Sequence, residues 1–156
     1  MINSNKTVKL VNEKINKIFP VISKPKVNGE INLPEDPSTM TGVEVSQKMT
    51  QATSWFVYCD YLLGLLKSEL LLVEAEYKIK LNAKSVPVRT ELGRQNADVI
   101  EAVVLEKNPA ILPLFERLTE LKALKAQMVT RLEIYKMFHS TLSREQSRRE
   151  AEMRMV

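Results

Sequence analysis

The chain has 156 residues, the size of one domain, and 23 Lys and Arg against 19 Asp and Glu give it a net charge of +4. Its four glycines are too few for a fold with many tight turns or for a glycine-rich phosphate loop. One cysteine and one histidine exclude an internal disulfide framework and a cysteine-based zinc site, and leave little for histidine chemistry.

No early apolar run has the form of a secretory signal, and no run of about 20 apolar residues could span a membrane. The best candidate, residues 56–66, is too short and contains Asp60. The sequence therefore predicts a soluble, cytoplasmic, all-α protein that is not an enzyme, needs no cofactor or metal, and does not contact a membrane.

Residues 4–18 predict a short helix, because apolar side chains recur there every three or four positions: Val8, Val11, Ile15 and Ile18. Ser4 or Asn5 is expected to cap its start, and Pro20 to stop it. Residues 20–40 contain four prolines and Gly29, which predicts an extended arm. We expect a boundary near residue 40, with the N-terminal helix and arm in 1–40 and a helical hairpin domain in 41–156.

A long helix is predicted from Thr41 to about Lys84, where no proline occurs. Its apolar positions alternate in steps of four and three, as in a heptad seam. This first seam consists of Val45, Met49, Ala52, Phe56, Cys59, Leu63, Leu66, Leu70, Val73 and Tyr77. Gly64 is either a point of close helix approach or a tolerated defect.

Ser85, Val86 and Pro87 are expected to break this helix, and residues 88–106 to form a shorter one weakened by Gly93. Asn108 and Pro109 then predict a restart, with asparagine as N-cap and proline at the first helical position. A second long helix follows from Ala110 to about Ala151. Its seam consists of Ile111, Leu114, Leu118, Leu121, Lys125, Met128, Leu132, Tyr135, His139 and Leu142.

Two long helices of similar length with a short connection predict an antiparallel, coiled-coil-like hairpin. The first helix also carries apolar side chains off its seam, namely Trp55, Leu62, Leu65, Leu71 and Leu72. A two-helix hairpin cannot bury so broad a surface. The middle helix, the N-terminal arm or another copy must cover it, and we expect a homo-oligomer that uses Trp55, Leu62, Leu65 and Leu72.

Neither His139 nor Cys59 indicates a catalytic or metal-binding site. His139 has no carboxylate at helical spacing to complete a metal site, so we interpret it as a polar seam residue that fixes helix register. Cys59 lies on the apolar seam, where it would act as a small hydrophobe.

Basic residues gather in two parts of the chain. Residues 1–26 contain six lysines against one glutamate, and residues 77–94 contain five cations against one glutamate. The second group follows Tyr77, and a cationic surface beside an aromatic ring suits sequence-independent binding to a phosphate backbone. Its cations are the candidate nucleic-acid-binding residues: Lys78, Lys80, Lys84, Arg89 and Arg94. The same cations could instead only solubilise a helix face.

The segment from Val73 to Lys84, VEAEYKIKLNAK, resembles the corresponding stretch of the UvsY-like recombination mediators of bacteriophages. A preceding amphipathic helix with a tryptophan, the Asn-Ala-Asp-Val run at 96–99 and the tail LSREQSRR at 142–149 fit the same pattern. The resemblance covers about residues 44–150 and implies a ring-like oligomer that binds single-stranded DNA. It also implies partners: a RecA-type recombinase that the protein loads, and the single-strand-binding protein that is displaced.

The resemblance places the family's pair of basic residues around an alanine on Asn82 and Lys84, and only Lys84 keeps the charge. Lys78 and Lys80 could compensate, and the basic N-terminal arm could add contacts or dock the recombinase. Two other functions remain open on the residues: a phage structural or assembly coiled coil, and a small helical inhibitor or adaptor of a host protein that uses residues 1–40.

Overall fold

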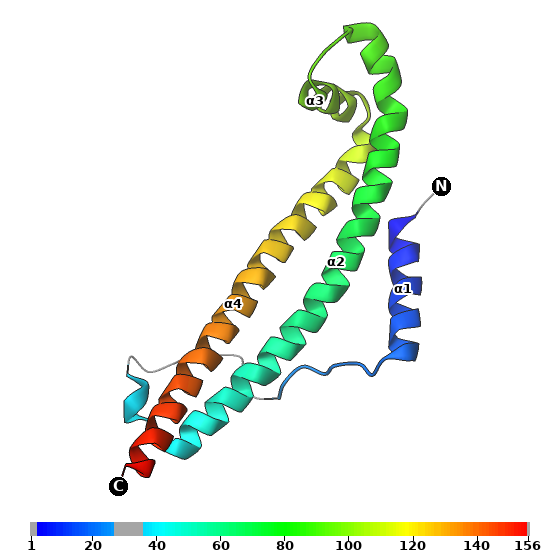
Figure 1. The fold of residues 1–156 in the computed structure, drawn as a ribbon. Coiled ribbons are helices and arrows are strands. Elements are labelled where there is room, and N and C mark those ends of the chain that lie inside the picture. The colour runs from blue at the N-terminus through cyan, green and yellow to red at the C-terminus, as the bar shows by residue number, and fades with distance from the viewer. Residues whose placement is uncertain (1–2, 27–35, 156) are drawn as a thin grey trace. The chain divides into compact units, whose positions relative to one another are not determined.

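The computed structural model describes residues 3–26 and 36–155, and this part of the chain contains helices and no strand. In chain order the elements are α1 (Ser4–Ile18), the 3-10 helix η1 (Pro37–Thr39), α2 (Gly42–Leu92), α3 (Ala97–Lys107), the 3-10 helix η2 (Pro109–Ile111) and α4 (Leu112–Arg154) (Figure 1). The prediction of an all-α protein with two long helices is confirmed.

The chain divides into two compact units. Unit 1 comprises residues 1–20 and 65–125, and unit 2 comprises residues 21–64 and 126–156. Residues 65–92 of α2 thus share unit 1 with residues 112–125 of α4, and the remaining parts of both helices share unit 2. The two long helices are therefore antiparallel, as predicted. The predicted boundary near residue 40 stays a prediction, and the part of the predicted arm at 27–35 lies outside the described residues.

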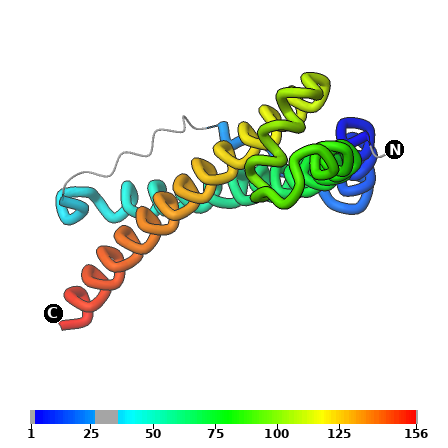
Figure 2. Tube along the Cα trace, turned by 90° about the horizontal axis from the view of Figure 1, so that it is seen from above, coloured from blue at the N-terminus to red at the C-terminus, as the bar shows by residue number. Residues whose placement is uncertain are grey.

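The helix α1 has the predicted bounds, but its cap is Asn3 and not Ser4 or Asn5. The Asn3 side chain accepts a hydrogen bond from the Lys6 N–H at 3.1 Å. The Ser4 N–H is therefore available to another partner, and it donates to Glu76 Oε2 of α2 at 2.7 Å. Within unit 1, α1 lies beside α2 (Figures 1 and 2).

A capping box begins α2. Thr41 Oγ1 accepts from the Glu44 N–H at 3.2 Å, and Glu44 Oε2 accepts from the Thr41 N–H at 2.6 Å. Two N–H groups that lack helical partners are satisfied in this way, which fixes the start of the helix where the sequence predicts it.

The predicted break at 85–87 is wrong, because α2 continues through Pro87 to Leu92. Proline lacks an N–H and costs about 3 kcal/mol inside a helix. Val88 follows directly and is 3% exposed in the core, and burial of such a side chain contributes about 1.5–3 kcal/mol. The packing of Val88 thus offsets much of the free-energy cost of the proline.

Gly93, which was expected inside a helix over 88–106, ends α2 instead. Its φ is 69°, and its N–H donates to the Arg89 carbonyl at 3.0 Å. Glycine adopts this left-handed conformation without a Cβ penalty and commonly follows the end of a helix. The shorter helix α3 accordingly begins only at Ala97.

The predicted restart at Asn108 and Pro109 occurs first as the 3-10 helix η2, and α4 begins at Leu112. The Asn108 side chain does not cap this restart. Its Nδ2 donates to the Val104 carbonyl at 3.0 Å, so it closes the end of α3.

The core of unit 1 joins α2, α3, η2 and α4, and all of its buried side chains except Val88, Ile100 and Val104 lie on the predicted seams. Its buried side chains are Leu70, Val73, Tyr77, Val88, Ile100, Val104, Ile111, Leu118 and Leu121. The middle helix α3 contributes Ile100 and Val104 to this core, so it covers part of the hairpin in unit 1.

The core of unit 2 is aromatic. The rings of Trp55 on α2 and Tyr135 on α4 stack, with centroids 6.5 Å apart, and Ala52 is buried beside them. Val45 and Leu142 are also fully buried, as their seam positions predict. His139 is exposed, so its predicted role as a buried polar seam residue is wrong; Phe138 beside it is the side chain that packs on this cluster.

Candidate nucleic-acid interface

Two of the five predicted cations, Lys78 and Lys80, are held by carboxylates one turn earlier on α2. Lys80 Nζ lies 2.6 Å from Glu76 Oε1, and Lys78 Nζ lies 3.6 Å from Glu74 Oε1. The Lys80 pair is the tighter, because Glu76 is nearly buried and also accepts from the Ser4 N–H. Lys80 therefore serves the docking of α1, and Lys78 keeps a mostly exposed ammonium.

Burial alone would raise the pKa of Glu76, but the hydrogen bonds from Lys80 and Ser4 outweigh it and lower the pKa to about 2. Glu76 is therefore ionised at neutral pH, and its charge is already balanced by Lys80.

Lys84, Arg89 and Arg94 are exposed, and none of them forms an ion pair with a residue that the structure describes. Lys84 and Arg89 lie on the last turns of α2, and Arg94 follows Gly93 in the connection to α3. We call these three the α2-end cations.

The predicted cations do not share one helix face. At about 100° per residue, Lys78 and Arg89 lie about 20° apart around α2, whereas Lys84 lies about 120° from Lys78. The predicted cations of α2 therefore form two separate positively charged surfaces and do not line one groove.

Tyr77, the aromatic residue expected beside these cations, is buried and 5% exposed. Its hydroxyl donates to Glu101 of α3, and its ring centroid lies 5.8 Å from that of Phe115. Burial, together with the nearby Glu101, raises the pKa of Tyr77. Through these contacts Tyr77 of α2 binds to both α3 and α4, so its ring is not available to stack on a base.

A more continuous cationic surface lies on α1. Its four lysines, Lys6, Lys9, Lys14 and Lys17, are all exposed, and none forms an ion pair with a described residue. At about 100° per residue they fall within about 140° of arc, with Glu13 among them. We call this surface the lysine face of α1.

The opposite side of α1 carries buried Ser4 and half-buried Val8, Val11 and Ile15. The docking of α1 through Ser4 therefore directs the lysine face outward. The charge of residues 1–26 indicated this surface, but the sequence-based site prediction did not include its lysines.

The four predicted oligomerisation residues differ in exposure. Trp55 is 8% exposed and covered by Tyr58 and Tyr135 of the same chain, so it does not need another copy to bury it. Leu62, Leu65 and Leu72 are half-buried. Leu71, which the sequence also places off the seam, is 68% exposed. Of the five apolar residues that the sequence places off the first seam, Leu71 is therefore the one that stays exposed.

Arginines near the C-terminal end of α4 form ion pairs and hydrogen bonds that hold unit 2 together. Glu145 accepts hydrogen bonds from Arg148 and Arg149, which lower its pKa to about 2. Arg149 Nη2 also donates to the carbonyls of Pro37, Ser38 and Met40, at 3.3, 3.2 and 2.6 Å. We call this contact the Arg149 clasp.

Cys59 is half-buried in the aromatic cluster of unit 2, where burial raises the pKa of its thiol. Among residues 3–26 and 36–155, no three His, Cys, Asp or Glu side chains are grouped as metal ligands would be. In the same residues no helix has both the length and the apolar character needed to cross a bilayer.

Comparisons of the chain with protein-family models, with curated proteins and with solved structures give no match.

Proposed function

We propose that the chain is a non-enzymatic protein that binds single-stranded DNA without sequence preference and acts as a recombination mediator. The lysine face of α1 is the observation that carries the DNA-binding part. Four exposed lysines on one side of a docked helix present ammonium groups to solvent with little competition from carboxylates. Contacts of this kind bind phosphates and do not distinguish bases.

The α2-end cations lie in the same unit and add charge to the proposed interface. The mediator role itself rests on the resemblance to the UvsY-like family. In that role the protein would hold the strand while a RecA-type recombinase replaces single-strand-binding protein. Several copies on one strand would raise the avidity of individually weak contacts.

Titration of a labelled oligothymidine at increasing salt, read by fluorescence anisotropy, tests DNA binding. The double variant Lys9→Gln/Lys14→Gln removes two charges from the lysine face. We expect it to lower the slope of log K against log salt by about 1.4, since each phosphate contact to a single strand contributes about 0.7. The control Lys67→Gln/Lys122→Gln removes two exposed lysines elsewhere and should leave the slope unchanged.

Absence of salt-sensitive binding by the unchanged protein at low ionic strength would overturn DNA binding as the function. Equal slopes for the two double variants would show that the lysine face is not the interface.

A structural or assembly coiled coil is the second candidate, and the exposure of Leu71 favours it. The two functions differ in what the α2-end cations do. Lys84→Gln should weaken DNA binding by a mediator, whereas an assembly protein would associate with itself as before and show no DNA affinity to lose.

A further inference from the structure

Phe19 is the aromatic residue of the chain that is most exposed to solvent. All nine aromatic residues, one Trp, four Tyr and four Phe, lie in the part of the chain that the structure describes. Phe19 is 62% exposed, and the other eight are buried or half-buried. Its ring is therefore open to a ligand, whereas the ring of Tyr77, which the sequence places beside the predicted cations of α2, is not.

The backbone of Phe19 is fixed at the end of α1. Its N–H donates to the Ile15 carbonyl at 2.8 Å, which closes the last turn of the helix. Its φ of −120° and ψ of 145° are extended, the conformation that the following residue, Pro20, favours. The ring is therefore carried by a backbone that is already ordered before a ligand binds.

Two cations of the lysine face precede Phe19 on the last turns of α1. Lys17 lies two residues before Phe19, and Lys14 lies about 4.5 Å before Lys17 along the helix axis. Neither lysine forms an ion pair with a described residue. An exposed ring at the end of a row of exposed ammonium groups is the combination that binds the bases and the phosphates of a single strand.

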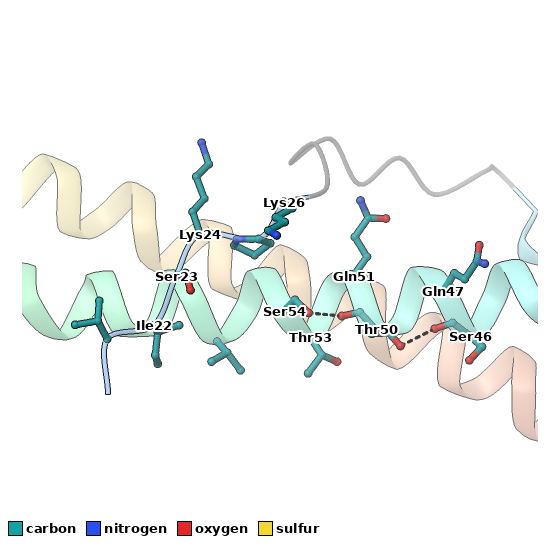
Figure 3. Close-up of a pocket in the computed structure, with 13 residues that line it drawn as sticks. Ile22, Ser23, Lys24, Lys26, Ser46, Gln47, Thr50, Gln51, Thr53 and Ser54 are labelled. Carbon is teal, nitrogen blue, oxygen red and sulfur yellow. Dashed lines mark hydrogen bonds between the residues drawn. The ribbon is translucent and has the colours of Figure 1, made fainter. Parts of the chain in front are cut away.

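The groove between residues 21–26 and α2 in unit 2 does not offer this combination (Figure 3). Its described lining contains no aromatic side chain. The hydroxyls of Thr50 and Ser54 on its α2 wall donate to the carbonyls of Ser46 and Thr50, at 3.0 and 2.9 Å. Cations and an exposed ring therefore occur together at the end of α1 and not in this groove.

We propose that Phe19 stacks on an unpaired base of DNA while Lys14 and Lys17 contact the neighbouring phosphates. The inference rests on the proposed function and deepens it, because phosphate contacts by lysines do not favour single strands over duplexes. The bases of a duplex are paired and stacked on one another, so a ring on the protein surface does not reach their faces. Phe19 thus makes the interface prefer single-stranded DNA, and it does so without reading the base, since every base has a π face.

The variant Phe19→Leu tests this role, because it removes the ring and keeps an apolar side chain. We expect it to weaken oligothymidine binding about five- to tenfold at low salt, the lower part of what one base–aromatic stack contributes. Binding of a duplex of the same length should not change. The slope of log K against log salt should also stay as in the unchanged protein, because no charge is removed. Phe19→Trp, which keeps an aromatic face, should restore the affinity for oligothymidine.

Phe19→Trp also gives a direct signal of stacking. Trp55, the single tryptophan of the unchanged chain, is 8% exposed and supplies a constant background. We expect oligothymidine to quench the emission of the added tryptophan saturably, and the duplex to leave it unchanged. Ile18→Ala is the matched control, because Ile18 is 71% exposed next to Phe19 and has no aromatic face. It should bind oligothymidine like the unchanged protein.

The outcomes separate this inference from the proposed function. If the unchanged protein does not bind oligothymidine, both fail. If it binds, but Phe19→Leu binds equally well or loses affinity for single strand and duplex alike, only the stacking role of Phe19 is overturned. An equal loss of oligothymidine binding in Ile18→Ala would also overturn it, and a lower mass of both variants in light scattering would then identify the end of α1 as a contact between copies of the chain.

Discussion

Glu76 accepts hydrogen bonds from two different parts of unit 1, the Lys80 ammonium and the Ser4 N–H of α1. The Lys80 contact could be predicted, because a glutamate four residues before a lysine on a helix forms a pair. The Ser4 contact could not, since it joins residues 72 positions apart. The sequence therefore predicted Lys80 as a free cation for DNA binding. In the structure Lys80 instead pairs with Glu76, the residue that binds α1.

Replacement of Glu76 tests this docking contact. Glu76→Gln should lower the free energy of unfolding by about 1–2 kcal/mol at neutral pH, because hydrogen bonds to a charged acceptor are lost. The folded pKa of about 2 lies below the ordinary 4.5, so this contribution is present above pH 4.5 and disappears as pH falls toward 2. The difference in free energy of unfolding between the unchanged protein and Glu76→Gln, measured by urea unfolding, should therefore decrease from pH 4.5 toward pH 2.

Glu74→Gln is the matched control, since Glu74 pairs with Lys78 at 3.6 Å on the surface. We expect it to change the free energy of unfolding by less than about 1 kcal/mol. An effect as large as that of Glu76→Gln would show that the Ser4 contact contributes nothing.

Among the helices, the seams were predicted well and the ends less well. Burial of alternate four- and three-spaced residues such as Leu63, Leu70 and Leu118 follows directly from periodicity. The end of α2 does not, because the helix continues past Pro87, a strong local stop signal, and Val88 directly after it packs in the core. The helix boundary is therefore decided by tertiary packing that no local pattern contains.

The glycines of α2 and its connection should respond in opposite directions to alanine. Gly93→Ala should destabilise by about 1 kcal/mol, because its φ of 69° disfavours a side chain. Gly64→Ala should stabilise by up to about 1 kcal/mol, because Gly64 is inside a helix and a Cβ there meets nothing within 4 Å. Urea unfolding followed by circular dichroism measures both.

Open space also surrounds the Cβ position of Gly93, so steric conflict does not complicate the comparison. A change of the same sign at both positions would contradict the assigned end of α2. For Gly64 the open space favours a tolerated defect over a point of close helix approach within the chain.

For the whole molecule, the fold covers part of the apolar surface that the sequence places off the first seam, and leaves part of it exposed. Trp55 is covered by the chain's own Tyr58 and Tyr135, while Leu71 is left 68% exposed. The sequence could show that Trp55 lies off the heptad seam. It could not show that α2 and α4 meet through a broader aromatic contact in unit 2, which depends on the three-dimensional position of Tyr135.

Self-association, which is part of the proposed function, should be sensitive to Leu71. Light scattering of the unchanged protein should give a multiple of the 17.8 kDa chain mass, and Leu71→Glu should shift the distribution toward the single chain. A charge at Leu71 would have to be buried in the assembly, at a cost of several kcal/mol.

Met153→Glu is the control, because Met153 is 76% exposed near the end of α4. A single-chain mass for the unchanged protein at all concentrations would contradict the homo-oligomer. Loss of association in both variants would show that Leu71 is not specific to the contact.

The Arg149 clasp has a consequence for how the protein emerges from the ribosome. Synthesis runs from the N-terminus, and domains generally fold as units during it. Every residue of unit 1 precedes position 126, so this unit can mature while translation continues. Unit 2 can be completed only after α4 has been synthesised. Residues 37–40, just before α2, gain their hydrogen bonds to Arg149 only at that stage. Residues 37–40 are thus held in unit 2 by a side chain that is synthesised more than 100 residues later.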